Sequence, residues 1–187
     1  GLPKDRKIIV SGGDRLELKG FHLLVDALPE VLRQHPGTLL VIVGGPGRFG
    51  RDFTAEIETR IARHGLENQV RLVGAKPHDE LPKWYNAADV FALMSSREGS
   101  PNVLLEALAC GTPAVATHVG GIVDELKDAQ LGRLVAQRDA ESIAAQICET
   151  LRTKWDKAAI RAKMESRDWH STAKIAVQHL SDLQLAR

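Results

Sequence analysis

Aromatic side chains make up only 4% of the 187 residues, and the charges nearly cancel, with 25 Lys and Arg against 24 Asp and Glu. Nucleic-acid binding uses clustered basic charge or a platform of stacked rings, so the composition argues against that class of partner. No apolar run approaches the roughly 20 residues that span a bilayer. The sequence also has no HExxH, CxxC or DxD pattern, so nothing in it predicts a bound metal.

Cysteine is scarce as well, since only Cys110 and Cys148 occur and neither has a metal-ligand companion nearby. Two buried thiols in a reducing cytoplasm are the simplest interpretation. Hydrophobic residues reach 43%, which is enough for a folded core. The sequence starts at Gly1 without a Met, and we therefore expect a piece of a longer protein.

Short apolar runs alternate with longer amphipathic segments along most of the chain. The runs that predict strands cover residues 7–11, 38–43, 70–73, 90–93, 114–117 and 132–135. The segments that predict helices cover residues 19–34, 52–64, 78–86, 101–110, 139–152, 155–165 and 169–184. Such alternation builds a parallel sheet with helices on both faces. We predict one α/β domain over residues 1–187, doubly wound and Rossmann-like, with a helical C-terminal tail at 152–187.

Ligands bind such sheets outside the carboxyl ends of the strands. The loop after the first predicted strand joins Gly12 and Gly13 to the cations Arg15 and Lys19, just ahead of a helix. This combination suits a diphosphate, because Arg offers a fork of N–H groups and Lys a point charge. On this loop alone, a solvated turn with ordinary surface charges is the simpler interpretation.

The loop after the second strand, Gly45–Gly50, has the spacing G-x-G-x-x-G. This pattern suggests a dinucleotide-binding oxidoreductase, but the fingerprint belongs after the first strand and needs an acidic residue about 20 positions later. Here it follows the second strand. We expect these glycines to form a turn close to a ligand.

The segment from Ser95 to Gly121 contains the most specific pattern. Ser100 is a candidate helix cap, and Pro101 suits the first helical position. The backbone N–H groups of Asn102 and Val103 would then point out of the helix start, which favours an anion or a hydroxyl group there.

Two carboxylates flank that helix start. Glu98 precedes it, and Glu106 interrupts an otherwise apolar stretch inside the helix. A buried carboxylate needs a partner, and adjacent ribose hydroxyls would supply one for Glu106. Two alternatives stay open at this point: a Glu106 that points to water, and a glycosidase-like pair of acid and nucleophile.

The run Glu98–Glu106 (EGSPNVLLE) resembles the E-x7-E motif of the retaining glycosyltransferases of family 4, the group 1 family with GT-B architecture. The likeness continues through Ala107–Pro113 and Gly120-Gly121, and reaches back through residues 70–90, Gly44–Gly47 and Lys19-Gly20. Arg167-Asp168-Trp169 resembles the closing Trp segment of that family. Nearly the whole chain is covered.

The resemblance implies the C-terminal, donor-binding domain of such an enzyme, with a UDP-, GDP- or ADP-sugar as donor and no metal or other cofactor. The departing phosphate would guide attack on the same face of the sugar, so that its configuration is retained. By this resemblance the donor diphosphate would be bound by Gly13, Arg15 and Lys19. The donor sugar would be bound by Glu98, as the catalytic residue, and by Ser100, Asn102 and Val103. The ribose would be bound by Glu106, and the base by Lys76 and Leu81.

Three departures from the family accompany the likeness. Arg15 lies closer to Lys19 than is usual, Asp14 beside it opposes phosphate binding, and Met94 stands where Pro is common. The chain also matches only the second of the family's two domains. The acceptor-binding N-terminal domain, with its catalytic His, would therefore be a missing partner, and we expect no sugar transfer by this stretch alone.

A second interpretation is a nucleotide-sugar-binding module without catalysis, and a third is the NAD oxidoreductase. In the tail, residues 152–167 carry six Lys or Arg against two acids and only a thin apolar stripe. A solvated basic helix is the plain interpretation. The stronger stripe at 169–184 would contact the missing domain. We expect a cytoplasmic enzyme, and a peripheral association of the full protein with the inner membrane face stays open.

Overall fold

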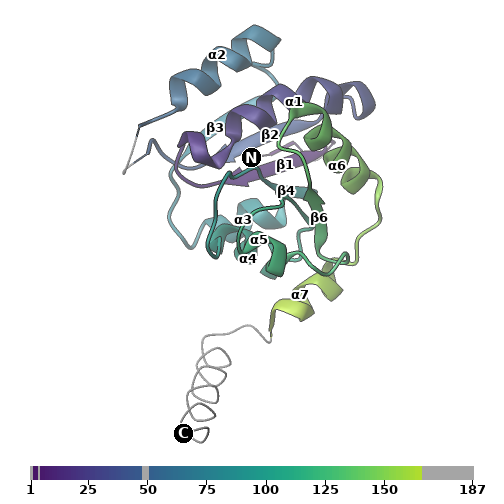
Figure 1. Cartoon of the computed structure of the whole chain (residues 1–187). Helices are drawn as coiled ribbons and strands as arrows, with labels where there is room; N and C mark the ends of the chain where they lie inside the picture. Colours follow the sequence, from purple (N-terminus) through teal and green to yellow (C-terminus); the bar gives the residue numbers. More distant parts are fainter. Residues whose placement is uncertain (1, 4, 48–50, 166–187) are drawn as a thin grey trace, which may run out of the picture.

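The computed structural model describes residues 2–3, 5–47 and 51–165. A six-stranded sheet forms its centre, with the strand order β3-β2-β1-β4-β5-β6 and every pairing parallel (Figure 1). The strands are β1 (Ile8–Gly12), β2 (Leu39–Val43), β3 (Val70–Gly74), β4 (Val90–Leu93), β5 (Ala114–Thr117) and β6 (Gly132–Val135). This is the doubly wound, Rossmann-like order, in which the sheet reverses its direction of growth between β1 and β4. The predicted fold class is confirmed.

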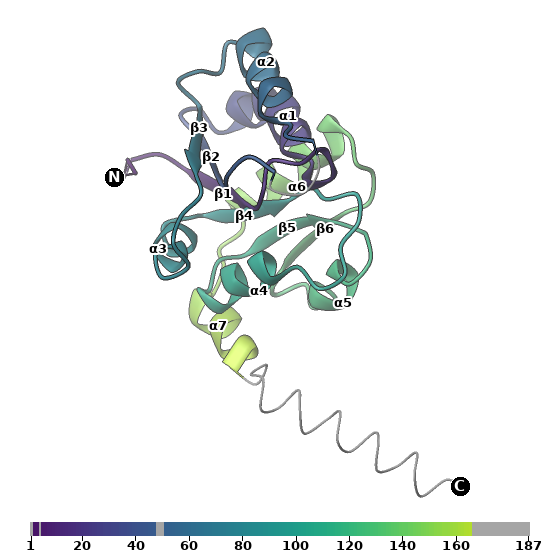
Figure 2. The same ribbon diagram turned by 90° about the vertical axis from the view of Figure 1, so that its left-hand side faces the viewer.

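Helices cover both faces of the sheet (Figures 1 and 2). On one face lie α1 (Phe21–Gln34), α2 (Thr54–His64) and α6 (Ala140–Arg152). On the other face lie α3 (Leu81–Asn86), α4 (Asn102–Ala109), α5 (Ile122–Glu125) and α7 (Lys157–Glu165). A short 3-10 turn, η1 (Glu17–Lys19), precedes α1.

The central strands are apolar along their length because both of their faces are covered. In β1 the side chain of Ile9 joins the core under α1, whereas Ile8 and Val10 join the core under α3 and α4. The neighbouring strand β2 (LLVIV) is buried at all five positions. Alternate side chains of one strand thus enter two separate cores, which fixes the register of the sheet.

Each of the six predicted helices within the described residues begins one to three residues later than predicted, and one further helix was missed. The first helix begins at Phe21 and not at residue 19, because Gly20 adopts a left-handed conformation with φ of 70°. The third begins at Leu81 and not at residue 78. In α4 the first helical residue is Asn102, and Pro101 occupies the cap position in place of Ser100. The four-residue α5 follows β5 and has too few residues to show a periodic pattern.

The basic segment at the start of the tail is bound to the domain. α7 packs against α4, and its thin apolar stripe is buried at Ile160 and Met164. The Lys157 amine donates to the carbonyl of Ala88 at 2.9 Å, and Arg161 donates to that of Cys110 at 3.2 Å. Two of the basic side chains thus bind main-chain carbonyls, and the helix is not simply solvated.

The predicted helix at 169–184 and the motif at Arg167-Asp168-Trp169 lie outside the described residues. Within the described ranges, every helix is too short or too polar to cross a bilayer.

Replacing Ile160 tests how firmly α7 belongs to this domain. Its side chain is 1% exposed, so Ile160→Ala leaves a cavity between α7 and α4. We expect the free energy of unfolding to fall by about 2–4 kcal/mol, measured by urea denaturation. The exposed Ala162→Ser in the same helix is the control and should change stability by less than ~0.5 kcal/mol. A similarly small effect of Ile160→Ala would show that α7 is not part of the cooperative core.

Candidate functional site

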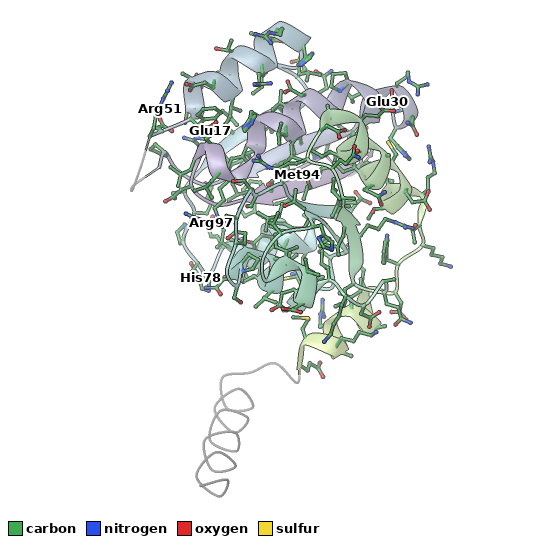
Figure 3. All side chains as sticks on the ribbon, viewed as in Figure 1. Glu17, Glu30, Arg51, His78, Met94 and Arg97 are labelled. Atoms are coloured by element: carbon green, nitrogen blue, oxygen red, sulfur yellow. The ribbon has the colours of Figure 1, made fainter. Side chains whose placement is uncertain are left out.

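The loops that follow the strands gather on one side of the molecule. Figure 3 labels Glu17, Arg51, His78 and Arg97, which come from the loops after β1, β2, β3 and β4, and all four lie on the left of that view. Glu30, late in α1, lies on the opposite side. Figure 2 looks onto the side with the loops, which is where ligands bind in open α/β sheets.

An ion pair joins the loop after β1 to the loop after β4. The amine of Lys19 lies 2.7 Å from Oε1 of Glu98, and the two side chains are only 20% and 11% exposed. The hydroxyl of Ser95 donates to the same carboxylate oxygen at 2.6 Å. The structure thus brings together a residue predicted to hold the diphosphate and the residue predicted to be catalytic.

Main-chain contacts hold the two loops together around this pair. The N–H of Ser96 donates to the carbonyl of Leu18 at 2.8 Å. Gly20 packs directly on Met94, because a Cβ at Gly20 would lie 2.1 Å from the Met94 carbonyl oxygen. From the loop after β6, Nε of Arg138 donates to that same carbonyl at 2.7 Å. The loop after β1 and the loop after β6 therefore both hold the chain at the end of β4.

Residues at and after the carboxyl end of β5 hold the main chain around Glu98 in place. The buried hydroxyl of Thr117 donates to the carbonyl of Ser95 at 2.6 Å. The N–H of Gly121 donates to the carbonyl of Glu98 at 3.3 Å. The backbones approach so closely that a Cβ on Gly121 would lie 1.8 Å from the carbonyl oxygen of Gly99.

The predicted diphosphate residues occupy different surroundings. Gly13 has φ of 129° and lies under Lys19, since a Cβ there would be 3.6 Å from Cε of Lys19. Arg15 points instead toward the loop after β2, where it donates to Oγ1 of Thr54 at 2.7 Å and to the carbonyl of Gly44 at 2.6 Å. Lys19 thus lies beside the glutamate, whereas Arg15 connects two neighbouring loops.

The start of α4 carries the predicted sugar-binding residues. Ser100 and Asn102 are exposed, and Val103 is half-buried. Pro101, in an extended conformation, accepts N–H bonds from Leu104 and Leu105 at 2.9 and 3.4 Å. None of the described side chains caps this helix. Its first N–H groups, which have no partner within the helix, therefore stay available at the start of α4, next to the loop with Glu98.

Glu106, one turn into α4, accepts a hydrogen bond from the hydroxyl of Tyr85 at 3.1 Å. Burial, and next the nearby carboxylate, raise the pKa of Tyr85. The phenol therefore stays protonated and can act as the donor. The carboxylate is half-buried, and its partner within the protein is this tyrosine, which the sequence analysis did not identify.

A cavity of about 190 Å³ lies between α3 and α4. It is lined by His78, Leu81, Pro82, Tyr85, Glu106, Ala109 and Cys110. The structure therefore brings together Leu81 and Glu106, which were predicted to contact the base and the ribose. Lys76 is half-buried in the loop after β3 and does not line this cavity. Burial raises the pKa of the Cys110 thiol, so it is a poor nucleophile at neutral pH.

The glycines after β2 serve close packing. The N–H of Gly44 donates to the carbonyl of Gly74 at 2.9 Å. A Cβ on Gly44 would lie 1.8 Å from the carbonyl oxygen of Gly13, and one on Gly47 would lie 2.2 Å from Leu16. The contact at Gly47 accounts for one glycine of the Gly45–Gly50 pattern by packing, and the dinucleotide fingerprint belongs after β1.

Two further features of the described ranges bear on ligands. No group of three or more His, Cys, Asp or Glu side chains within these ranges could hold a metal ion. A larger groove of about 700 Å³ lies at the opposite, amino edge of the strands, where Leu2, Ile8 and Trp84 are among its lining residues. It contains none of the residues predicted for the site.

Four residues at the site were not predicted from the sequence, namely Ser95, Thr117, Tyr85 and Arg138. Ser95 and Thr117 are polar residues at the ends of buried apolar strands, a signal that could have identified them. Tyr85 and Arg138 gave no such signal, because their partners come from distant parts of the chain.

Replacing Gly121 tests the close main-chain packing beside Glu98. A methyl group at Gly121 would collide with the carbonyl of Gly99, so Gly121→Ala should lower the free energy of unfolding by about 1–3 kcal/mol. Gly99→Ala is the matched control, because a Cβ there meets nothing within 4 Å. Thermal unfolding of both variants gives the comparison. Equal melting temperatures would mean that the loops after β4 and β5 do not pack as closely as described.

Comparison with known proteins gives one consistent family. Residues 1–168 match the family described as glycosyl transferases group 1. The D-inositol 3-phosphate glycosyltransferase of Corynebacterium urealyticum is 31% identical over 184 residues, which are 95% of this chain and 43% of that protein. The enzyme of the same name from Frankia alni is 33% identical over 93% of this chain and 45% of its own length. The chain thus spans less than half the length of these relatives.

Solved structures of other proteins share the fold of this chain. Sucrose-phosphate synthase from Thermosynechococcus elongatus superimposes with a TM-score of 0.82 and 30% identity over 100% of this chain and 47% of its own. Anabaena HepE, solved with UDP-glucose, is 24% identical with a TM-score of 0.65 over 87% of this chain and 48% of its own, and shows the shared fold alone. With its fold, its E-x7-E helix and this match across nearly its whole length, the chain belongs to the group 1 family of glycosyltransferases.

Proposed function

We propose that this chain is the donor-binding domain of a retaining glycosyltransferase that transfers a sugar from a nucleoside-diphosphate sugar to an acceptor. The observation that carries the proposal is the Lys19–Glu98 pair at the carboxyl ends of β1 and β4. It places a cation for a phosphate and a carboxylate for sugar hydroxyls side by side. Family membership supports the reaction class, and HepE is an example of this fold with UDP-glucose bound.

The diphosphate would lie between Lys19 and the start of α4. The amine supplies a positive charge, Gly13 beneath it allows close approach of the main chain, and the N–H groups of Asn102 and Val103 supply donors. Arg15 would act mainly by holding the loop after β1 in place, because it already binds Thr54 and Gly44.

The nucleoside would lie at the other end of α4. Ligand pockets for whole small molecules usually exceed about 300 Å³, so the cavity of about 190 Å³ beside Leu81 and Glu106 suits one part of the donor only. Glu106 would accept from the ribose hydroxyls while Tyr85 holds its other oxygen. The backbone near Lys76 would border the base.

Glu98 would act on the donor sugar as an ionised acceptor. Lys19 and Ser95 both bind Oε1, which leaves Oε2 for sugar hydroxyls. In the transfer, the bond between the anomeric carbon and the phosphate oxygen breaks, and a bond to the acceptor oxygen forms on the same face. The acceptor proton passes to the departing phosphate oxygen, whose developing charge Lys19 stabilises. The acceptor domain would lie in the part of the relatives that this chain does not match, so we expect no transfer by this chain alone.

Titration with sugar nucleotides tests this function. We expect UDP, GDP or ADP, and the matching sugar nucleotide, to shift backbone NMR signals near Gly13, Lys19, Asn102 and Val103. Glu106→Gln should weaken both ligands about 10-fold or more, because a charged acceptor is lost. Glu98→Gln should weaken only the sugar nucleotide.

The exposed Glu58→Gln in α2 is the control and should bind as the unaltered chain does. Binding of NADH in preference to UDP, GDP, ADP and their sugar nucleotides would favour an oxidoreductase. An absence of binding by every nucleotide would contradict the proposal. Binding without any transfer by the complete protein would favour a non-catalytic module.

A further inference from the structure

We propose that Ser95 is a positioning residue, which holds the carboxylate of Glu98 toward the donor sugar independently of Lys19. The proposal rests on the function proposed above and adds a residue to it. Ser95 lies two residues after the end of β4, it is 0% exposed, and its hydroxyl donates to Oε1 of Glu98 at 2.6 Å. A buried hydroxyl requires a partner, and here the partner is the reactive carboxylate.

Thr117 holds Ser95 in turn. Its side chain is 1% exposed, and its hydroxyl donates to the carbonyl of Ser95 at 2.6 Å. Two buried hydroxyl groups thus form a series from β5 to β4 and on to the carboxylate. Because both lie at the ends of sheet strands, their positions are set by the sheet itself and change little with the conformation of the surface loops.

Lys19 cannot supply the same constraint during the reaction. Its amine contacts Oε1 of Glu98 at 2.7 Å, but it is also the cation expected to bind the diphosphate. A long flexible side chain drawn toward phosphate would release the carboxylate. Ser95 would then be the remaining donor on Oε1, so that Oε2 still faces the sugar.

Because Lys19 would bind the diphosphate and Ser95 would hold Glu98, the loss of Ser95 should affect only ligands that carry the sugar. Loss of the Ser95 hydroxyl should leave the affinity for a free nucleoside diphosphate within twofold of the original. The affinity for the matching sugar nucleotide should fall about 2- to 12-fold, which corresponds to one typical hydrogen bond. If Ser95 merely stabilised the fold, both affinities would change together.

The experiment compares Ser95→Ala with Ser96→Ala, which changes the exposed neighbour whose hydroxyl lies 3.5 Å from the Leu18 carbonyl. Calorimetry with UDP and UDP-glucose, GDP and GDP-mannose, and ADP and ADP-glucose identifies the pair that binds, and that pair is used for all variants. Ser96→Ala should bind both members of the pair as the unaltered chain does. Thermal unfolding checks that each variant is folded.

Thr117→Val provides a second route if Ser95→Ala does not fold, because it keeps the side-chain volume and removes only the hydroxyl that holds Ser95. It should weaken the sugar nucleotide selectively and by less than Ser95→Ala. Equal losses for nucleotide and sugar nucleotide, or no loss for either, would overturn the role of Ser95 while leaving the donor site in place. Failure of the unaltered chain to bind any of the six ligands would instead overturn the proposed function.

Discussion

The ion pair between Lys19 and Glu98 is the interaction on which the rest of the site depends. It exists because β1 and β4 are neighbours in the sheet although about 80 residues separate them along the chain. Two charges that are mostly withdrawn from water are costly unless they are paired. A bound diphosphate would supply a new partner for Lys19, while the Ser95 hydroxyl remains for Glu98. The carboxylate of Glu98 thus has two partners within the protein, Lys19 and Ser95, and under the proposed function only Lys19 would be shared with the donor.

Close approach of main chains makes this pairing possible. Gly20 lies against Met94, Gly44 against Gly13, and Gly121 against Gly99, and at each of these places a Cβ would lie within about 2 Å of a carbonyl oxygen. The loops can therefore pack at main-chain distance, and the side chains that remain point into the site. The glycines at these positions are a packing requirement, and so is Gly47 after β2, where a Cβ would lie 2.2 Å from Leu16.

The helix α4 connects the two ends of the site. Glu98 precedes its first residue, whereas Glu106 lies in its second turn, ~6 Å further along the axis from Asn102. One carboxylate therefore faces the Lys19 end, and the other faces the cavity beside α3. Of the seven residues between them, Leu104 packs into the core, and Ala107 and Leu108 do so just after Glu106. The motif thus combines a spacing for ligand groups with a stripe that fixes the helix on the sheet.

The sequence by itself determined the alternation of strands and helices, the parallel sheet, the place of Lys19 and Glu98 after strands, and the place of Glu106 within a helix. These follow from local periodicity and from the rule that ligands bind at the carboxyl ends of strands. Only the tertiary structure decided that Lys19 contacts Glu98, that Arg15 turns to Thr54, and that Tyr85 holds Glu106. The cap at Pro101 and the packing of α7 also required it. The physical reason is the same in each case: these contacts join residues whose proximity depends on strand order and on helix packing, and hydrophobic periodicity carries no information about which distant polar group a side chain will meet.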